Sequence, residues 1–111
     1  MYGFFVRYVS SEETVLSILG EDGSLIATRS VQIGKISFVE SLTSEMIALS
    51  HDVDLYHHDI FAIGVVVDPI ATLEWETETY FKQSLEASFG FTAVVGEEEN
   101  AVKSKLLALA L

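Results

Sequence analysis

Residues 60–69, IFAIGVVVDP, constrain the fold of this chain more than any other stretch. Eight apolar or glycine residues, three of them consecutive valines, precede Asp68 and Pro69 without any polar alternation. Continuous apolar runs of this length that end at a turn signal are typical of strands buried on both faces. We therefore predict a central strand here. Because helical patterns precede and follow it, this strand closes a βαβ unit, which implies a sheet covered by helices.

Three further strands are predicted ahead of the central one. Aromatic and β-branched residues, which favour strands, are concentrated in residues 2–9, 14–19 and 24–33. Residues 21–23, Glu-Asp-Gly, have the composition of a hairpin turn, and Gly23 can take the positive φ that such turns require. We expect these three strands to be antiparallel neighbours.

Apolar residues at helical spacing predict the helices. The first begins at Ser37, which has capping-box spacing to Glu40, and ends near residue 50. The second carries one apolar face and ends at a glycine: Phe81, Leu85, Phe89 and then Gly90.

A fifth strand over residues 91–95 and a third helix over residues 101–110 complete the chain. The order is βββαβαβα. An antiparallel start followed by right-handed βαβ crossovers predicts an α/β fold with a mixed five-stranded sheet and helices on its faces. This is the ribonuclease H-like arrangement found in each lobe of the actin-like ATPases. We expect one domain over residues 1–111.

Composition argues against several classes of function. Six Lys and Arg against 17 Asp and Glu give a formal net charge of −11, which would repel a nucleic-acid backbone. The chain has no cysteine for a disulfide or a thiolate metal site. Because we find neither a signal-peptide pattern nor an apolar run near the ~20 residues of a membrane helix, we expect a cytoplasmic protein without membrane contact. Hydrophobic residues nevertheless make up 50% of the chain, which favours a surface that meets a partner.

Several motifs, in this order of elements, resemble those of the ROK family of bacterial repressors and sugar kinases. The hairpin VLSILGEDGSLIATRSV is similar to that family's second and third strands, and FAIGVVVDP resembles its strand G-I-G-I-x-V-P-G. The segment LEWETETYFKQSLEASFGFTAVVGEEENAVKSKLLA is similar to its run of a tryptophan, a helix ending in L-E-x-x-F-G, a short strand and E-N-D-A-N-A-A. The resemblance covers essentially the whole chain and corresponds to the N-terminal lobe of such proteins.

Departures from the family pattern bear on activity. Family kinases carry a phosphate loop, D-x-G-G-T, whose glycines let backbone amides approach phosphate. Residues 6–14 read VRYVSSEET here, without glycine, so we expect no ATP phosphate to bind. The family's P-G after the central strand becomes Asp68-Pro69. Its Asn-Asp pair, which looks like the sugar ligand and the catalytic base, becomes Glu97-Glu98, while Asn100 keeps a later asparagine.

The candidate site residues each have a structural alternative. Glu98 is the candidate catalytic base, although its side chain is one methylene longer than aspartate, and the acids around it equally suit the positive end of a helix dipole. Trp75 could contact a ligand above the central strand or cap the core. The candidate substrate-binding residues are Glu97, Glu98, Asn100, Asp68 and Trp75. The candidate metal ligands, for zinc or nickel, are His51, His57 and His58 with Asp52, Asp54 and Asp59, but their spacing matches no known motif and a polar surface crossover explains them equally well.

The resemblance, together with the missing phosphate loop, implies a non-catalytic lobe related to the sugar-effector domain of a ROK-type transcriptional regulator, with a sugar or sugar-phosphate effector in the full-length protein and no cofactor. Because LLALAL carries no helix stop signal, we expect a fragment or a reduced version that lacks its second lobe. One alternative is a lobe of a diverged sugar kinase. The other is a self-associating interaction module, for which the apolar residues of the last helix argue: Leu106, Leu107, Leu109 and Leu111.

Overall fold

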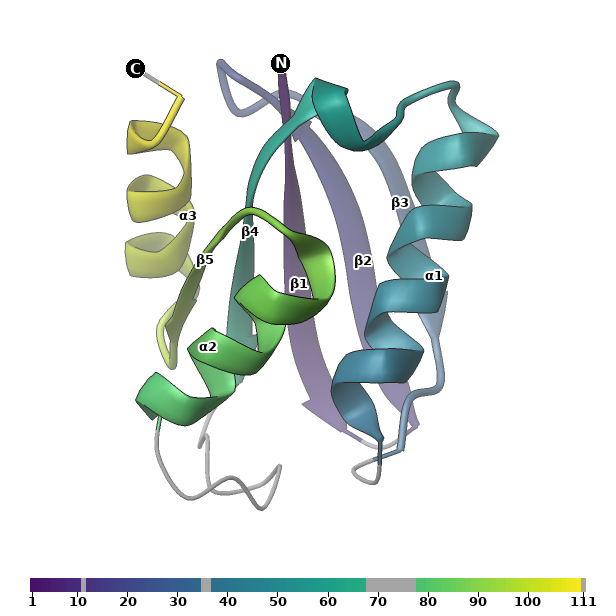
Figure 1. The fold of residues 1–111 in the computed structure, drawn as a ribbon, viewed down its shortest axis with the longest axis vertical. Helices are drawn as coiled ribbons and strands as arrows, with labels where there is room; N and C mark the ends of the chain where they lie inside the picture. Colours follow the sequence, from purple (N-terminus) through teal and green to yellow (C-terminus); the bar gives the residue numbers. More distant parts are fainter. Residues whose placement is uncertain (11, 35–36, 68–77, 111) are drawn as a thin grey trace.

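The computed structural model describes residues 1–10, 12–34, 37–67 and 78–110 (Figure 1). The chain is α/β, as predicted, with a mixed sheet of five strands and three α-helices in the described part. In chain order the elements are β1 (Tyr2–Ser10), β2 (Glu13–Gly20), β3 (Leu25–Val31), α1 (Phe38–Asp52), the 3-10 turn η1 (His57–Asp59), β4 (Ile60–Val67), α2 (Glu78–Phe89), β5 (Thr92–Gly96) and α3 (Glu99–Ala108).

The strands lie in the order β3-β2-β1-β4-β5. β1 pairs antiparallel with β2, and β2 pairs antiparallel with β3, which confirms the predicted antiparallel start. β4 runs parallel to both of its neighbours, β1 and β5. In the register of the sheet, Val6 of β1 lies opposite Leu16 of β2 and Val65 of β4. β1 therefore holds the middle position, and the apolar strand β4 lies beside it with both edges paired.

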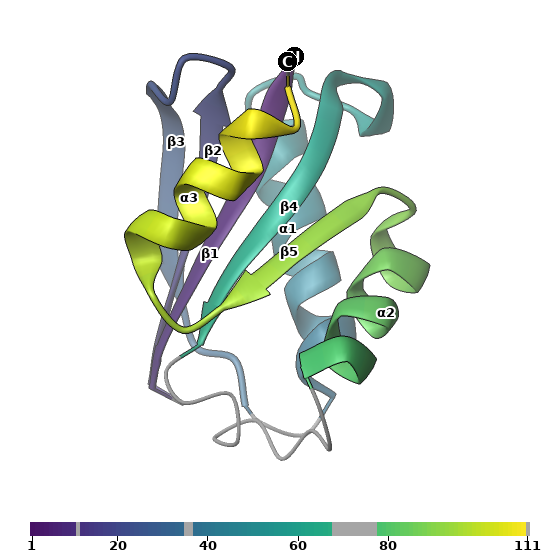
Figure 2. The ribbon, with the colours of Figure 1, turned by 90° about the vertical axis from the view of Figure 1, so that its left-hand side faces the viewer.

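The helices form two layers around the sheet. α1 and α2 cover one face and α3 covers the other (Figure 2). Alternation along β4 serves both layers, since Ile63 and Val65 belong to the core under α1 and α2, whereas Ala62 and Val66 belong to the core under α3. The absence of polar alternation in the sequence of β4 follows directly from this double burial.

Gly64 of β4 allows α3 to approach the sheet closely. A Cβ atom at this position would lie 3.1 Å from Val102 Cγ1 and 3.3 Å from Leu106 Cδ2. Both α3 side chains are buried, at 2% and 0% exposure. The glycine in an otherwise β-branched strand is therefore explained by close packing rather than by backbone conformation.

The predicted signals at the ends of the elements are confirmed for two glycines and wrong for the start of α1. Gly23 and Gly90 take positive φ, 86° and 83°, as expected for a hairpin turn and a helix end. Ser37 is the N-cap of α1, but its φ of 56° is left-handed and its side chain makes no capping hydrogen bond. The predicted capping box with Glu40 was therefore wrong, because a serine must adopt an extended conformation to present its hydroxyl to the first helical turn.

No helix in the described ranges is long and apolar enough to cross a membrane.

We predict that Leu106→Ala lowers the free energy of unfolding by about 2–5 kcal/mol, because it opens a cavity between α3 and β4. Leu109→Ala at the C-cap of the same helix is the control, since Leu109 is 44% exposed, and it should change stability by less than about 0.5 kcal/mol. Urea unfolding monitored by circular dichroism measures both. Equal losses for the two variants would contradict the packing of α3 described above.

Candidate functional site

The carboxyl ends of the parallel strands β1, β4 and β5 meet at one edge of the sheet, which we call the carboxyl edge (Figure 2). Open α/β sheets bind ligands at this edge. Glu97, Glu98 and Asn100 follow β5 here and are all exposed. Asp68 and Trp75, the other two candidate substrate-binding residues, lie outside the described residues.

Glu98 acts as the N-cap of α3. Its Oε1 accepts a hydrogen bond from the Asn100 N–H at 3.1 Å, and its Oε2 accepts one from the Ala101 N–H at 2.6 Å. Both carboxylate oxygens are thus engaged by backbone donors that the helix would otherwise leave without an intrahelical partner. This geometry supports the structural alternative for Glu98, because a general base needs an oxygen directed at its substrate.

The hairpin between β1 and β2 contains the residues that the sequence resemblance matches to a phosphate loop. Strand pairing continues to Ser10 opposite Glu13. The Glu12 N–H donates to Ser10 Oγ at 3.2 Å, and the side chains of Glu12 and Glu13 are exposed. Two exposed carboxylates give this end of the hairpin a negative potential, which disfavours a phosphate.

Two buried hydroxyl groups lie just inside this hairpin. Tyr8 of β1 and Thr14 of β2 are direct cross-strand partners, with exposed fractions of 7% and 0%. Neither hydroxyl oxygen has a hydrogen-bond partner among the described residues. The Tyr8 ring packs edge to face on Phe38, the first residue of α1, at a centroid distance of 5.6 Å. Buried hydroxyls without partners are uncommon, because each loses its hydration without compensation.

The sequence analysis did not predict this hydroxyl pair, although the alternation of apolar residues along the strands points to it. Phe4, Val6 and Tyr8 alternate along β1 and all belong to the core under α1 and α2. Thr14 begins the corresponding series on β2, ahead of Leu16 and Ile18. A polar residue at the end of a period-two apolar series is a predictable inward-facing hydroxyl.

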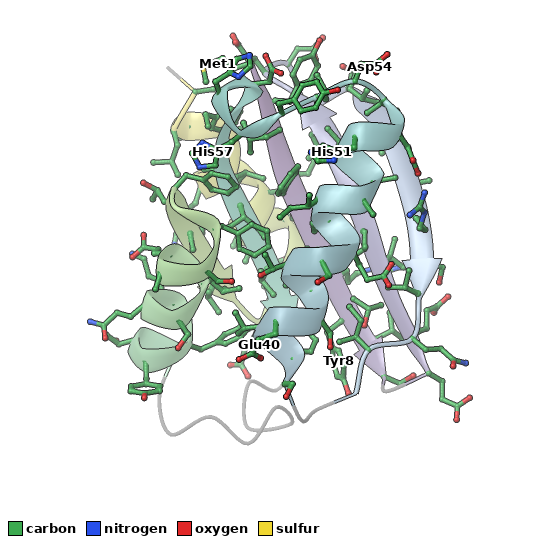
Figure 3. All side chains as sticks on the ribbon, turned by 45° about the vertical axis from the view of Figure 1, so that its right-hand side comes forward. Met1, Tyr8, Glu40, His51, Asp54 and His57 are labelled. Atoms are coloured by element: carbon green, nitrogen blue, oxygen red, sulfur yellow. The ribbon has the colours of Figure 1, made fainter. Side chains whose placement is uncertain are left out.

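A small cavity lies at the amino-terminal ends of the parallel strands, opposite the carboxyl edge. Its volume is about 120 Å³, below the ~300 Å³ typical of ligand pockets. It lies between the carboxyl-terminal ends of α1 and α2, and its wall combines aromatic rings with hydroxyl and imidazole groups: Phe4, Ile47, Ser50, His51, Tyr56, His57, Ile60, Ser88, Phe89 and Phe91. Figure 3 shows His51 and His57 at the end of the molecule opposite Tyr8 and Glu40.

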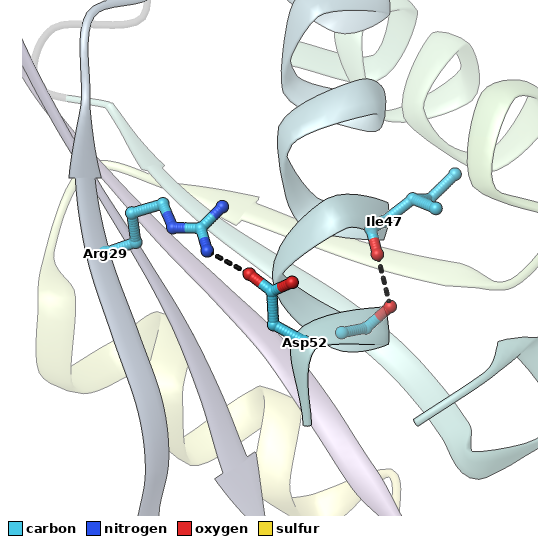
Figure 4. A network of polar contacts seen from close by, with 4 residues as sticks. Arg29, Ile47 and Asp52 are labelled. Carbon is cyan, nitrogen blue, oxygen red and sulfur yellow. Dashed lines mark hydrogen bonds and ion pairs between the residues drawn. The ribbon is translucent and has the colours of Figure 1, made fainter. Parts of the chain in front are cut away.

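Polar side chains around this cavity form hydrogen bonds with other groups of the protein. His57 Nε2 lies 3.1 Å from the Phe89 carbonyl oxygen at the end of α2. Ser50 Oγ donates to the Ile47 carbonyl oxygen at 2.9 Å (Figure 4), and Ser88 Oγ lies 2.7 Å from Thr43 Oγ1. The His57 contact connects η1 to the end of α2, and the Ser88 contact connects α2 to α1, so these polar groups stabilise the packing of the helices.

The three histidines proposed as metal ligands have separate surroundings. His51 packs on the Tyr56 ring at 5.0 Å between centroids, and His57 packs on the Phe91 ring at 5.4 Å. The His58 side chain is 82% exposed and lies 3.5 Å from Asp59 Oδ1. Within the described ranges, no three His, Asp or Glu residues converge in a group that could hold a metal ion.

No protein-family model matches this chain, and no curated protein matches it significantly.

We predict that Thr14→Val leaves the free energy of unfolding unchanged or raises it by up to about 1 kcal/mol, because it removes a buried hydroxyl that has no partner. Thr28→Val on β3 is the matched control. The Thr28 hydroxyl donates to the Leu16 carbonyl oxygen at 3.1 Å, so its removal should lower stability by up to about 1 kcal/mol. Chemical unfolding measures both. A loss at Thr14 as large as that at Thr28 would mean that the Thr14 hydroxyl is hydrogen-bonded in solution.

Proposed function

We propose that this chain is a non-catalytic lobe of the actin-like ATPase type, related to the sugar-effector domain of ROK-type transcriptional regulators. The observation that carries the proposal is the hairpin between β1 and β2. By the sequence resemblance it corresponds to the phosphate loop of the related kinases, and it carries exposed carboxylates at Glu12 and Glu13. The carboxylates repel a triphosphate, and the turn has no glycine to bring backbone amides close to it.

The arrangement of the sheet supports the assignment to a ribonuclease H-like lobe. Three antiparallel strands are followed by two strands parallel to β1, with α1 and α2 on one face and α3 on the other. This is the combination that the sequence motifs imply. Because an architecture of this kind hosts many functions, the functional part of the proposal rests on the carboxyl edge and on the ROK-like motifs.

The state of Glu98 supports a non-catalytic role. A proton acceptor in sugar phosphorylation must reach a sugar hydroxyl, whereas both Glu98 oxygens accept hydrogen bonds from the first turn of α3. Asn100 is exposed in the same turn and keeps the family's asparagine. In this proposal a sugar or sugar-phosphate effector contacts the carboxyl edge of the lobe together with a second lobe, in the cytoplasm.

We predict that Glu98→Ala lowers the free energy of unfolding by about 1 kcal/mol, because α3 loses its N-cap. Glu98→Asp should keep the stability, since aspartate is a favoured N-cap residue. Neither variant nor the parent chain should hydrolyse ATP in the presence of magnesium and a panel of monosaccharides.

The same assay contains the result that would overturn the proposal. Sugar-dependent ATP hydrolysis by the parent chain that disappears in a folded Glu98→Ala variant would identify Glu98 as a catalytic base. Circular dichroism of each variant separates this outcome from loss of the fold.

A further inference from the structure

The outer edge of β3 is open. Among the described residues β3 is the last strand of the sheet and pairs only with β2, so alternate backbone N–H and C=O groups of Leu25–Val31 face outward. Figure 2 shows β3 as the end strand of the sheet, next to β2. The opposite edge strand, β5, is only five residues long, and Glu86 Oε2 accepts a hydrogen bond from its Ala93 N–H at 3.0 Å. A side chain therefore covers part of the β5 edge.

The open edge of β3 also exposes apolar side chains. Leu25 and Ile26 are 60% and 44% exposed. The register of β3 against β2 shifts here, with Ile18 opposite Ala27 but Leu19 opposite Leu25. The shift leaves Ile26 without a partner on β2. Two adjacent aliphatic side chains beside unpaired backbone groups are a template for pairing with another strand.

The charge around β3 differs from that of the rest of the chain. No acidic residue occurs between Asp22 and Glu40, although the chain has 17. Arg29 is the only charged residue of β3, and it forms an ion pair with Asp52 at the end of α1 (Figure 4). A second copy of a chain with net charge −11 meets like charge over most of the surface, and at physiological salt the repulsion acts over ~8 Å. Because β3 carries no acidic residue, two copies can approach each other along this strand with little charge repulsion.

Acids at the two ends of β3 bond within their own chain. Asp22 accepts a hydrogen bond from the Ser24 N–H at 3.0 Å, and hydrogen bonds from Ser24 hold the pKa of the Asp22 carboxyl below its usual value. At the other end, Ser30 Oγ donates to Glu13 Oε2 at 3.4 Å. Neither carboxylate stands on β3 itself, so the strand edge remains free of negative charge.

We propose that two copies of this chain associate through their β3 strands, antiparallel about a two-fold axis at Thr28. Residue 28 is the centre of Leu25–Val31, and this register places Thr28 opposite Thr28 of the second copy. It also places Ile26 opposite Ser30 and Arg29 opposite Ala27, so no like charges face each other across the pair. The two sheets of five strands become one continuous sheet with its outer edges formed by β5.

The occupant that this edge favours is a second copy rather than an unrelated strand. A two-fold axis needs a surface that complements itself, and the strand has apolar residues at both ends, small polar residues in its second half and a neutralised charge. Pairing over seven residues is small beside the ~1,600 Å² of a standard stable interface, so the dimer is expected to be weak. This proposal does not depend on the proposed function.

Cysteine cross-linking tests the proposed register, because the chain has no cysteine of its own. In Thr28→Cys the two introduced thiols would stand on Cα atoms roughly 4.5–5.5 Å apart, within disulfide range. Mild oxidation should therefore convert most of this variant to a covalent dimer. In Leu25→Cys the matched thiols would be separated by about six residues, or roughly 20 Å, and should not cross-link. Equal cross-linking of both variants, or none in Thr28→Cys, would overturn the proposal.

Light scattering tests association without oxidation. The mass of the parent chain should rise with concentration from 12.2 kDa toward twice that value. Ile26→Lys should weaken association at least tenfold while leaving the unfolding curve unchanged, because lysine on an exposed edge strand opposes pairing. A parent chain that stays monomeric up to millimolar concentration, or an Ile26→Lys variant that associates as strongly as the parent, would contradict the proposed interface.

Discussion

Burial of β4 on both faces is the constraint on which the rest of the structure depends. The strand has β1 and β5 as neighbours in the sheet, α1 and α2 above one face and α3 above the other. One layer of helices can bury only one face of this apolar strand of eight residues. The chain therefore needs a helix layer on each face of the sheet. Gly64 sets the distance of the α3 layer, because any side chain there would push against Val102 and Leu106.

The fold brings the three parallel strands to a carboxyl edge that carries several exposed acidic side chains. The β1–β2 hairpin presents Glu12 and Glu13, and the start of α3 presents Glu97 and Glu99. Glu98, between these last two, serves as a helix cap. The chain as a whole has 17 acidic and six basic residues. We therefore propose that the lobe kept an architecture suited to nucleotide binding without the groups that bind nucleotides.

Periodic patterns predicted most of the fold because each reports a local property. The double burial of β4, the apolar face of α2 and the glycines at the hairpin and the helix end are all encoded within a few residues. The capping box at Ser37 failed for the opposite reason. Its spacing was correct, but the backbone there is left-handed, and sequence spacing does not specify φ.

The properties of the candidate sites depend on contacts between distant segments. The missing partners of Tyr8 and Thr14 could not be read from either strand alone, because both the pairing of β1 with β2 and the cover from α1 bury these hydroxyls. The ion pair that neutralises Arg29 joins residues 23 positions apart. The last helix had suggested self-association, but Leu106 is buried against the sheet, and only the assembled sheet reveals that β3 is the open edge.

Titration of the chain with magnesium and ATP, followed by the backbone amide signals of β1 and β2, tests the central claim of a lobe without a phosphate site most directly. The account predicts no saturable shift of the Glu12 and Glu13 amides up to millimolar ATP. Saturable, magnesium-dependent shifts confined to this hairpin would show that it binds phosphate and would contradict the account.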